Sequence, residues 1–314
     1  MKATAIVAVV LIHSLPAVWA PETSRALRHL GQLLRFAVPT FFFASGFLYY
    51  QPAPISLATV GRRLRRILAP YFCVSVAALA YDAWKPGHAG TDSALQNLLF
   101  GAAFSPYYFV AVLAALIPLI WPMSRLPPST VLGLLLLNEL YGMLSRPHGA
   151  PLTFWLLRNP LLWGPWFVLG WLCGSQRNAL DVLSARTRRL GLLACGVVLI
   201  AGLKLRMTYE LSVLVTVIAD QILILAAIVL LFLAGRSMAH VPLLVRRLSE
   251  WTYAIYLLHL FFVYAALDVL RPLLRLPPAL DVPLAFVCGL AGALLVTQVL
   301  RSVLGPVSRD VIGA

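Results

Sequence analysis

A histidine interrupts the first apolar stretch of the chain. Lys2 precedes an apolar run from Ala3 to Ile12, and His13 and Ser14 follow it. In a helix, Lys2 and His13 lie about 16 Å apart along the axis and, after eleven steps of about 100°, on nearly the same face. A neutral imidazole in that position can take a proton from a hydroxyl group. The alternative is a histidine that only hydrogen-bonds a neighbouring helix.

Four arginines stand within five positions, directly before an apolar run: Arg62, Arg63, Arg65 and Arg66. Guanidinium groups match the geometry of phosphate oxygens, so this cluster at a predicted helix entrance is a candidate phosphate clamp. The alternative is an anchor that contacts anionic lipid.

Other polar side chains within apolar runs are weaker candidates for lining a site. Ser45 precedes Gly46, a pair that equally favours close helix packing. Glu139 could orient an imidazole, or could simply pair with an arginine such as Arg158. Arg35 is a further candidate, and His259 could be a second imidazole at the site or a hydrogen-bonded structural residue. The four cysteines show no metal-ligand spacing, and we predict no metal.

The composition indicates that these residues belong to a membrane protein. The chain has 314 residues, of which 61% are hydrophobic and only 11% charged, whereas soluble domains carry about 25% charged residues. The formal net charge of +14 comes from basic residues in short connections between apolar runs, a pattern that orients membrane proteins rather than binding nucleic acid. We therefore expect the lipid bilayer, and no nucleic acid, as a partner.

The apolar runs predict an all-α, polytopic membrane protein with about ten transmembrane helices in a single domain, 1–314. The expected spans are 2–19, 33–50, 67–84, 95–121, 129–145, 153–173, 189–205, 210–234, 254–271 and 280–304. Lys and Arg in alternate loops place both termini in the cytoplasm. Residues 1–20 could instead be a signal peptide, but the histidine within the apolar run favours a retained span.

Several blocks of the sequence, in their order, resemble one family. They are Lys2-Ala3…His13-Ser14, "RFAVPTFFFASGF" at 35–47, "RRLRRILAP" at 62–70 and "WTYAIYLLHLFFV" at 251–263, with a tyrosine-rich "SPYYFVAVLAALIPLIWP" from residue 105. Together they look like the membrane-bound acyltransferase 3 family. Lys2 stands where arginine is usual in that family. Lysine keeps the positive charge but lacks the planar guanidinium that can bind phosphate through two hydrogen bonds.

The resemblance implies an inner-membrane enzyme that moves an acyl group, commonly acetyl, from acyl-coenzyme A to a hydroxyl of a cell-envelope sugar or glycan precursor. His13 would be the general base, and the phosphates of the donor would bind Lys2, Arg62, Arg63, Arg65 and Arg66. Two other functions remain open. One is a transporter or flippase for an envelope polysaccharide or lipid-linked precursor, although no internal repeat is visible. The other is a non-catalytic partner of a glycan assembly machine.

Overall fold

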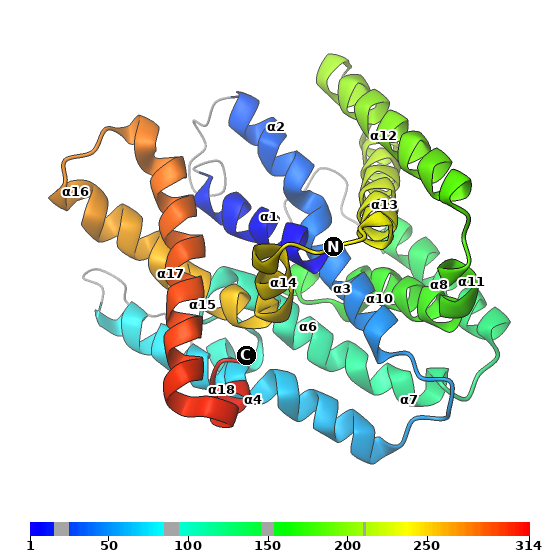
Figure 1. The fold of residues 1–314 in the computed structure, drawn as a ribbon, viewed down its shortest axis with the longest axis horizontal. Helices are drawn as coiled ribbons and strands as arrows, with labels where there is room; N and C mark the ends of the chain where they lie inside the picture. The colour runs from blue at the N-terminus through cyan, green and yellow to red at the C-terminus, as the bar shows by residue number, and fades with distance from the viewer. Residues whose placement is uncertain (16–24, 85–93, 146–153, 210–211) are drawn as a thin grey trace. The chain divides into compact units, whose positions relative to one another are not determined.

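The computed structural model describes residues 1–15, 25–84, 94–145, 154–209 and 212–314 (Figure 1). These residues form helices joined by short turns, which confirms the all-α prediction. Six segments among them are long and apolar enough to cross a membrane, whereas about ten spans were predicted. They are Leu57–Tyr81, Ser105–Met123, Ala185–Thr208, Val215–Ser237, Thr252–Leu273 and Pro278–Val311.

The difference in number lies largely in short apolar helices. α1 (Lys2–Ser14) and α3 (Ala37–Tyr49) have 13 residues each, and α10 (Pro160–Ser175) has 16. A span of about 20 residues is needed to cross the hydrocarbon core without help from its flanks. Helix α1 ends at Ser14, because a proline at 16 disfavours helical geometry in the residue before it. His13 therefore lies in the last turn of α1 and not in the middle of a helix over 2–19; residues 16–24 lie outside the described part.

The chain divides into two compact units, each built from separated segments. The first contains Met1–Ala5, Arg35–Ile55 and Leu119–Leu243, and the second contains Ile6–Leu34, Ser56–Pro118 and Leu244–Ala314. The prediction of a single domain over 1–314 remains a prediction.

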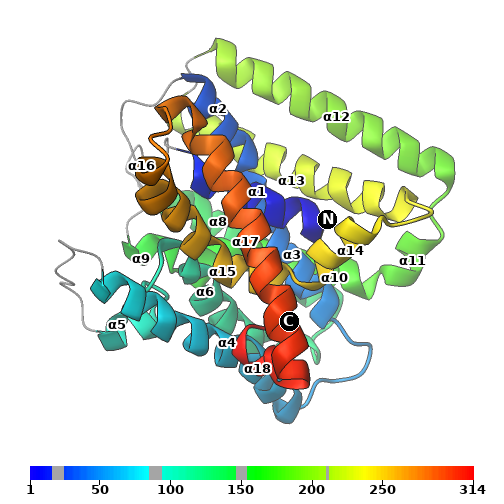
Figure 2. The ribbon, with the colours of Figure 1, turned by 60° about the vertical axis from the view of Figure 1, so that its left-hand side comes forward.

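The first unit is organised around the packing of α3 against α10. A side-chain carbon at Gly46 would overlap the backbone carbonyl of Phe167, and one at Gly170 would overlap that of Phe43. The two backbones therefore touch directly, as small residues allow between helices in lipid. This is the close packing that the Ser45-Gly46 pair suggested. Helix α8 (Pro128–Ser145) also packs on α10, and α12 (Ala185–Thr208) lies along α13 (Val213–Ser237), as Figures 1 and 2 show.

In the second unit, α4 (Leu57–Trp84) packs on α6 (Tyr108–Leu116), α15 (Thr252–Tyr264) and α18 (Ser308–Val311). Helix α15 also packs along α17 (Asp281–Leu304). Helix α4 begins ten residues before the predicted span at 67, because the Ser56 hydroxyl accepts from the Thr59 backbone N–H and caps the helix. The four arginines consequently lie inside α4 and not at its entrance.

Helix α15 does not continue regularly into the helix that follows it. Ala265–Leu270 form a π-helical stretch, after which α16 (Arg271–Leu273) resumes the α-helix. The remaining helices are short: α2 (Arg25–Leu33), α5 (Ala94–Leu99), α7 (Ile120–Met123), α9 (Phe154–Leu157), α11 (Arg177–Asp181) and α14 (Leu243–Glu250). Helix α5 occupies the start of the predicted 95–121 span, and the membrane-length segment begins after it, at Ser105.

The contact between α3 and α10 predicts a position-specific cost for larger side chains. Gly46→Val should push α3 away from the Phe167 carbonyl and destabilise the protein toward the upper end of the ~1–3 kcal/mol typical of overpacking. Gly133→Val on α8 is the matched control, since no atom lies within 4 Å of a side-chain carbon built there. Thermal unfolding in detergent should separate the two variants. Equal unfolding temperatures would contradict the direct backbone contact.

Candidate functional site

Two histidines from distant parts of the sequence meet in the second unit. The rings of His13 on α1 and His259 on α15 have centroids 5.4 Å apart and planes inclined by 41°. His259 is fully buried, while His13 is partly accessible. Of the residues singled out in the sequence, these two are brought into direct contact, which gives a pair of imidazoles.

The hydrogen bonds of His259 fix which of its nitrogens carries a proton. Its Nδ1 lies 2.8 Å from the carbonyl oxygen of Tyr256 and 3.2 Å from that of Ile255. Carbonyl oxygens only accept, so Nδ1–H donates and the neutral ring keeps a lone pair on Nε2. That Nε2 is buried and has no hydrogen-bond partner within the described residues. The site thus contains an imidazole nitrogen prepared to accept a proton or a hydrogen bond.

A reciprocal pair of tyrosines positions the helix that carries His259. The Tyr107 hydroxyl donates to the carbonyl of Leu257 over 2.5 Å, and the Tyr256 hydroxyl donates to the carbonyl of Pro106. Both tyrosines are buried, at 0% and 3% exposure. The two bonds therefore join the "SPYY" and "WTYAIYLLH" blocks across 150 residues of sequence.

Aromatic contacts extend from the histidine pair toward the arginine-rich end of α4. Tyr256 lies 6.2 Å from His259 and stacks on Tyr253 at 6.4 Å, measured between ring centroids. The Tyr253 hydroxyl donates to the Ile67 carbonyl over 2.5 Å, directly after Arg66 in the sequence. One row of side chains on α15 thus runs from the imidazoles to the arginine cluster.

Helical periodicity divides the arginine cluster between two faces of α4. Arg62, Arg65 and Arg66 are exposed, and Arg65 pairs with Asp310 at 3.6 Å. Arg63 is partly buried and continues the face that carries buried Ile67 and, further on, Tyr71 and Val74. The four side chains are consequently not one clamp, and Arg63 is the member on the packed face.

The remaining sequence candidates belong to the first unit. Arg35 donates to Asp220 on α13 at 3.5 Å, and Arg206 on α12 pairs with the same carboxylate. Asp220 therefore acts as an ion-pair partner for two guanidiniums. Lys2, Ser45 and Glu139 are partly buried, and their predicted roles at the site stay predictions. Arg158 donates to the Phe154 carbonyl and stacks on the ring of that residue.

Sequence reasoning missed the tyrosine pair and Asp310. The signal for Tyr256 was present, because Tyr253 and Tyr256 precede His259 at helical spacing within one block. Which carbonyls they bind depends on the approach of a distant segment and left no trace in the local sequence. Asp310 lies near the C-terminus, far from any motif, and its pairing with Arg65 follows only from the packing of α18 on α4.

The membrane-length helices indicate a multi-pass membrane protein, and the contact between His13 and His259 gives it a pair of imidazoles. The family model described as an acyltransferase domain matches residues 1–301. The chain therefore belongs to the acyltransferase 3 family and is a membrane acyltransferase. Searches of curated proteins and of solved structures gave no match.

Removing one of the two reciprocal tyrosine hydrogen bonds should lower both stability and turnover. Tyr256→Phe leaves the Pro106 carbonyl buried without its donor, which should cost about 1–3 kcal/mol of stability and lower turnover by displacing His259. Tyr209→Phe is the control, because Tyr209 is 62% exposed. Unfolding and acyl-transfer rates of the two variants, measured in the same detergent, provide the comparison. A Tyr256→Phe protein as stable and as active as the control would refute the positioning role.

Proposed function

We propose that this acyltransferase moves an acyl group, commonly acetyl, from acyl-coenzyme A to a hydroxyl of a cell-envelope sugar or glycan precursor at the inner membrane. Family membership supports acyl transfer. The observation that carries the finer proposal is the contact between His13 and His259, with one nitrogen of His259 committed to its own helix. A thioester is already activated, so the demanding step is to make a neutral hydroxyl nucleophilic, and an imidazole suits that step.

In this mechanism His13 is the general base. The acceptor oxygen attacks the thioester carbonyl carbon while His13 takes the hydroxyl proton. The tetrahedral intermediate then collapses, the carbon–sulfur bond breaks, and the coenzyme A sulfur leaves with the proton that His13 returns. The products are an ester and free coenzyme A, and His13 is neutral again. The accessibility of His13 compared with buried His259 favours this assignment.

His259 is the positioning residue for His13. With Nδ1–H donated to the carbonyls of Tyr256 and Ile255, its Nε2 can accept a hydrogen bond from a ring N–H of His13. Such a bond selects the His13 tautomer in which the other ring nitrogen has a lone pair for the substrate. The arrangement also stabilises the imidazolium that forms when His13 takes the proton.

The donor's phosphates are proposed to bind at the arginine-rich end of α4, on the cytosolic side. Arg63 has the most suitable position, since it lies on the packed face that leads toward Tyr71 and the interior of the unit. Arg62, Arg65 and Arg66 add positive charge that attracts the polyanionic donor. Lys2 remains a proposed contributor.

The reaction is tested directly with the purified protein. Radiolabelled acetyl-coenzyme A should transfer label to an envelope glycan fraction, and coenzyme A should be released in the same amount. Label that never leaves the donor would overturn the proposal. Movement of unmodified glycan across vesicles by the same preparation would favour the transporter instead.

Substitution of the proposed base separates catalysis from folding. His13→Gln keeps bulk and hydrogen bonding but cannot take a proton at neutral pH, so turnover should fall at least about 100-fold. Binding of acetyl-coenzyme A, measured by calorimetry, should hardly change. If His13 only joined helices, worth about 0.6 kcal/mol, glutamine would keep activity as well as fold. A well-folded, fully active His13→Gln protein would therefore refute the mechanism.

The division of the arginine cluster predicts unequal effects on donor binding. Arg63→Gln should weaken acetyl-coenzyme A binding by about 1.5–3 kcal/mol, the value of a charge-assisted hydrogen bond to phosphate. Arg186→Gln, an exposed arginine on α12, is the control. Calorimetry at low and high salt should show weaker salt dependence only for Arg63→Gln. Unchanged affinity would remove Arg63 from the donor site.

A further inference from the structure

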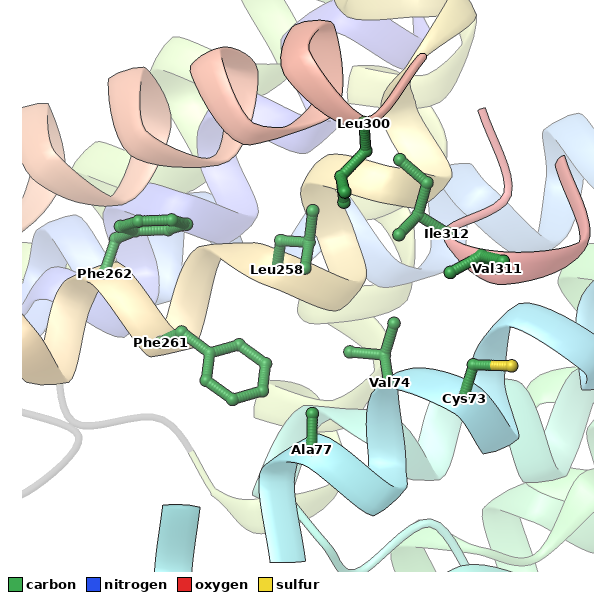
Figure 3. A pocket seen from close by; sticks show the side chains of 9 residues that line it. All are labelled: Cys73, Val74, Ala77, Leu258, Phe261, Phe262, Leu300, Val311 and Ile312. Carbon is green, nitrogen blue, oxygen red and sulfur yellow. The ribbon is translucent and has the colours of Figure 1, made fainter. Parts of the chain in front are cut away.

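An apolar pocket opens beside the exposed arginines of α4, within the second unit. It has a volume of about 390 Å³ and lies between α4, α15, α17 and α18. Cys73, Val74 and Ala77 line it from α4, opposite Leu258 and Phe261 of α15, with Leu300 of α17 at its edge. Figure 3 shows these side chains around the opening. The lining consists of hydrocarbon and one thiol, so a polar ligand would find no partner there.

The pocket and two of the arginines share one face of α4. Arg62, Arg66, Cys73 and Ala77 are exposed and follow one another at helical spacing. Arg66 precedes Cys73 by about 10 Å along the axis and Ala77 by about 16 Å. One leaflet of a bilayer has about 15 Å of hydrocarbon, half of a ~30 Å core. If Arg66 lies at the headgroup level, the pocket occupies the depth of the acyl chains below it.

The charge around the mouth of the pocket has one sign in excess. Further basic residues lie on α14, α17 and α18: Arg246, Arg247, Arg301 and Arg309. Arg247 and Arg301 both lie over the Trp251 ring, Leu300 beside Arg301 lines the pocket, and α18 packs on α4. Within the described residues, the acids beside them are Glu250 and Asp310, which pair with Arg246 at 2.9 Å and with Arg65 at 3.6 Å. The surface above the pocket therefore favours an anionic headgroup.

We propose that this groove binds an anionic phospholipid, with its phosphate at Arg62 and Arg66 and one acyl chain in the pocket lined by Cys73 and Ala77. The proposed lipid contacts differ from the proposed donor contact, because Arg62 and Arg66 are exposed whereas Arg63 lies on the neighbouring, partly buried face of α4. It also accounts for a cluster of arginines larger than orientation of the chain requires. A neutral phospholipid would fill the pocket without using the guanidiniums.

The thiol in the pocket provides the test. In a protein that keeps Cys73 and carries Cys173→Ser, Cys195→Ser and Cys288→Ser, alkylation of Cys73 by a maleimide is timed in mixed micelles. Phosphatidylglycerol at about four times its dissociation constant should slow the reaction about fivefold, by occupancy alone. Phosphatidylcholine should give much less protection. Arg66→Gln should remove the difference between the two lipids.

Matched substitutions separate the pocket from the general lipid surface. Ala77→Phe fills the pocket and should abolish the protection by phosphatidylglycerol. Val76→Phe places the same side chain at a 59% exposed position outside the lining and should preserve the protection. Equal alkylation rates in both lipids, or loss of protection in both variants, would overturn the proposal. Protection by a long-chain acyl-coenzyme A and not by phosphatidylglycerol would assign the pocket to the donor's chain instead. The readout uses no acyl transfer, so its failure is distinguishable from failure of the proposed function.

Discussion

The hydrogen bond from the His259 ring to its own helix is the interaction on which the candidate site depends. A neutral histidine has two tautomers, and the nitrogen that can accept a proton is set once the other nitrogen donates a hydrogen bond. Here the carbonyls of Tyr256 and Ile255 occupy Nδ1, so the ring and the helix form one rigid part. The position of the reactive nitrogen is then set by where α15 lies. Tyr107 and Tyr256 fix that position, because the hydroxyl of each donates to a backbone carbonyl beside the other tyrosine.

Charged side chains of the first unit are also held by specific partners. The described carboxylates of the first unit include Asp181 and Asp220, and each pairs with arginine: Asp181 with Arg236, and Asp220 with Arg206 and Arg35. Pairing of this kind lowers the cost of placing charge next to lipid. On α4, by contrast, arginines outnumber the described acids near them, and Arg65 pairs with Asp310. Excess charge at one end of a membrane protein is suited to contact with phosphate, whether on a substrate or on the bilayer.

Much of this arrangement could be predicted from the sequence, and the limits have physical causes. Apolar runs predicted the helices, because burial in lipid leaves the backbone no other way to satisfy its hydrogen bonds. His13 and His259 were both singled out, since an imidazole in an apolar run is conspicuous. Their contact could not be predicted, because it depends on how α1 and α15 meet. The arginine cluster was visible, but its division into two faces became clear only when the Ser56 cap placed the start of α4. The count of about ten spans is not confirmed, because helices as short as α3 fall below the length that crosses a membrane unaided.

The π-helical stretch after α15 is a place where this chain can change in length. A π-helix accommodates more residues per turn than the α-helix and usually occurs as a single wide turn within one. Deleting one residue from Ala265–Leu270 should let the α-helix continue without rotating the residues beyond it, because the wide turn holds the extra residue. Arg271, which pairs at 2.9 Å with Asp281 at the start of α17, would then keep its partner. In an alignment of homologous sequences, gaps in this segment should therefore occur without changes at Arg271 and Asp281.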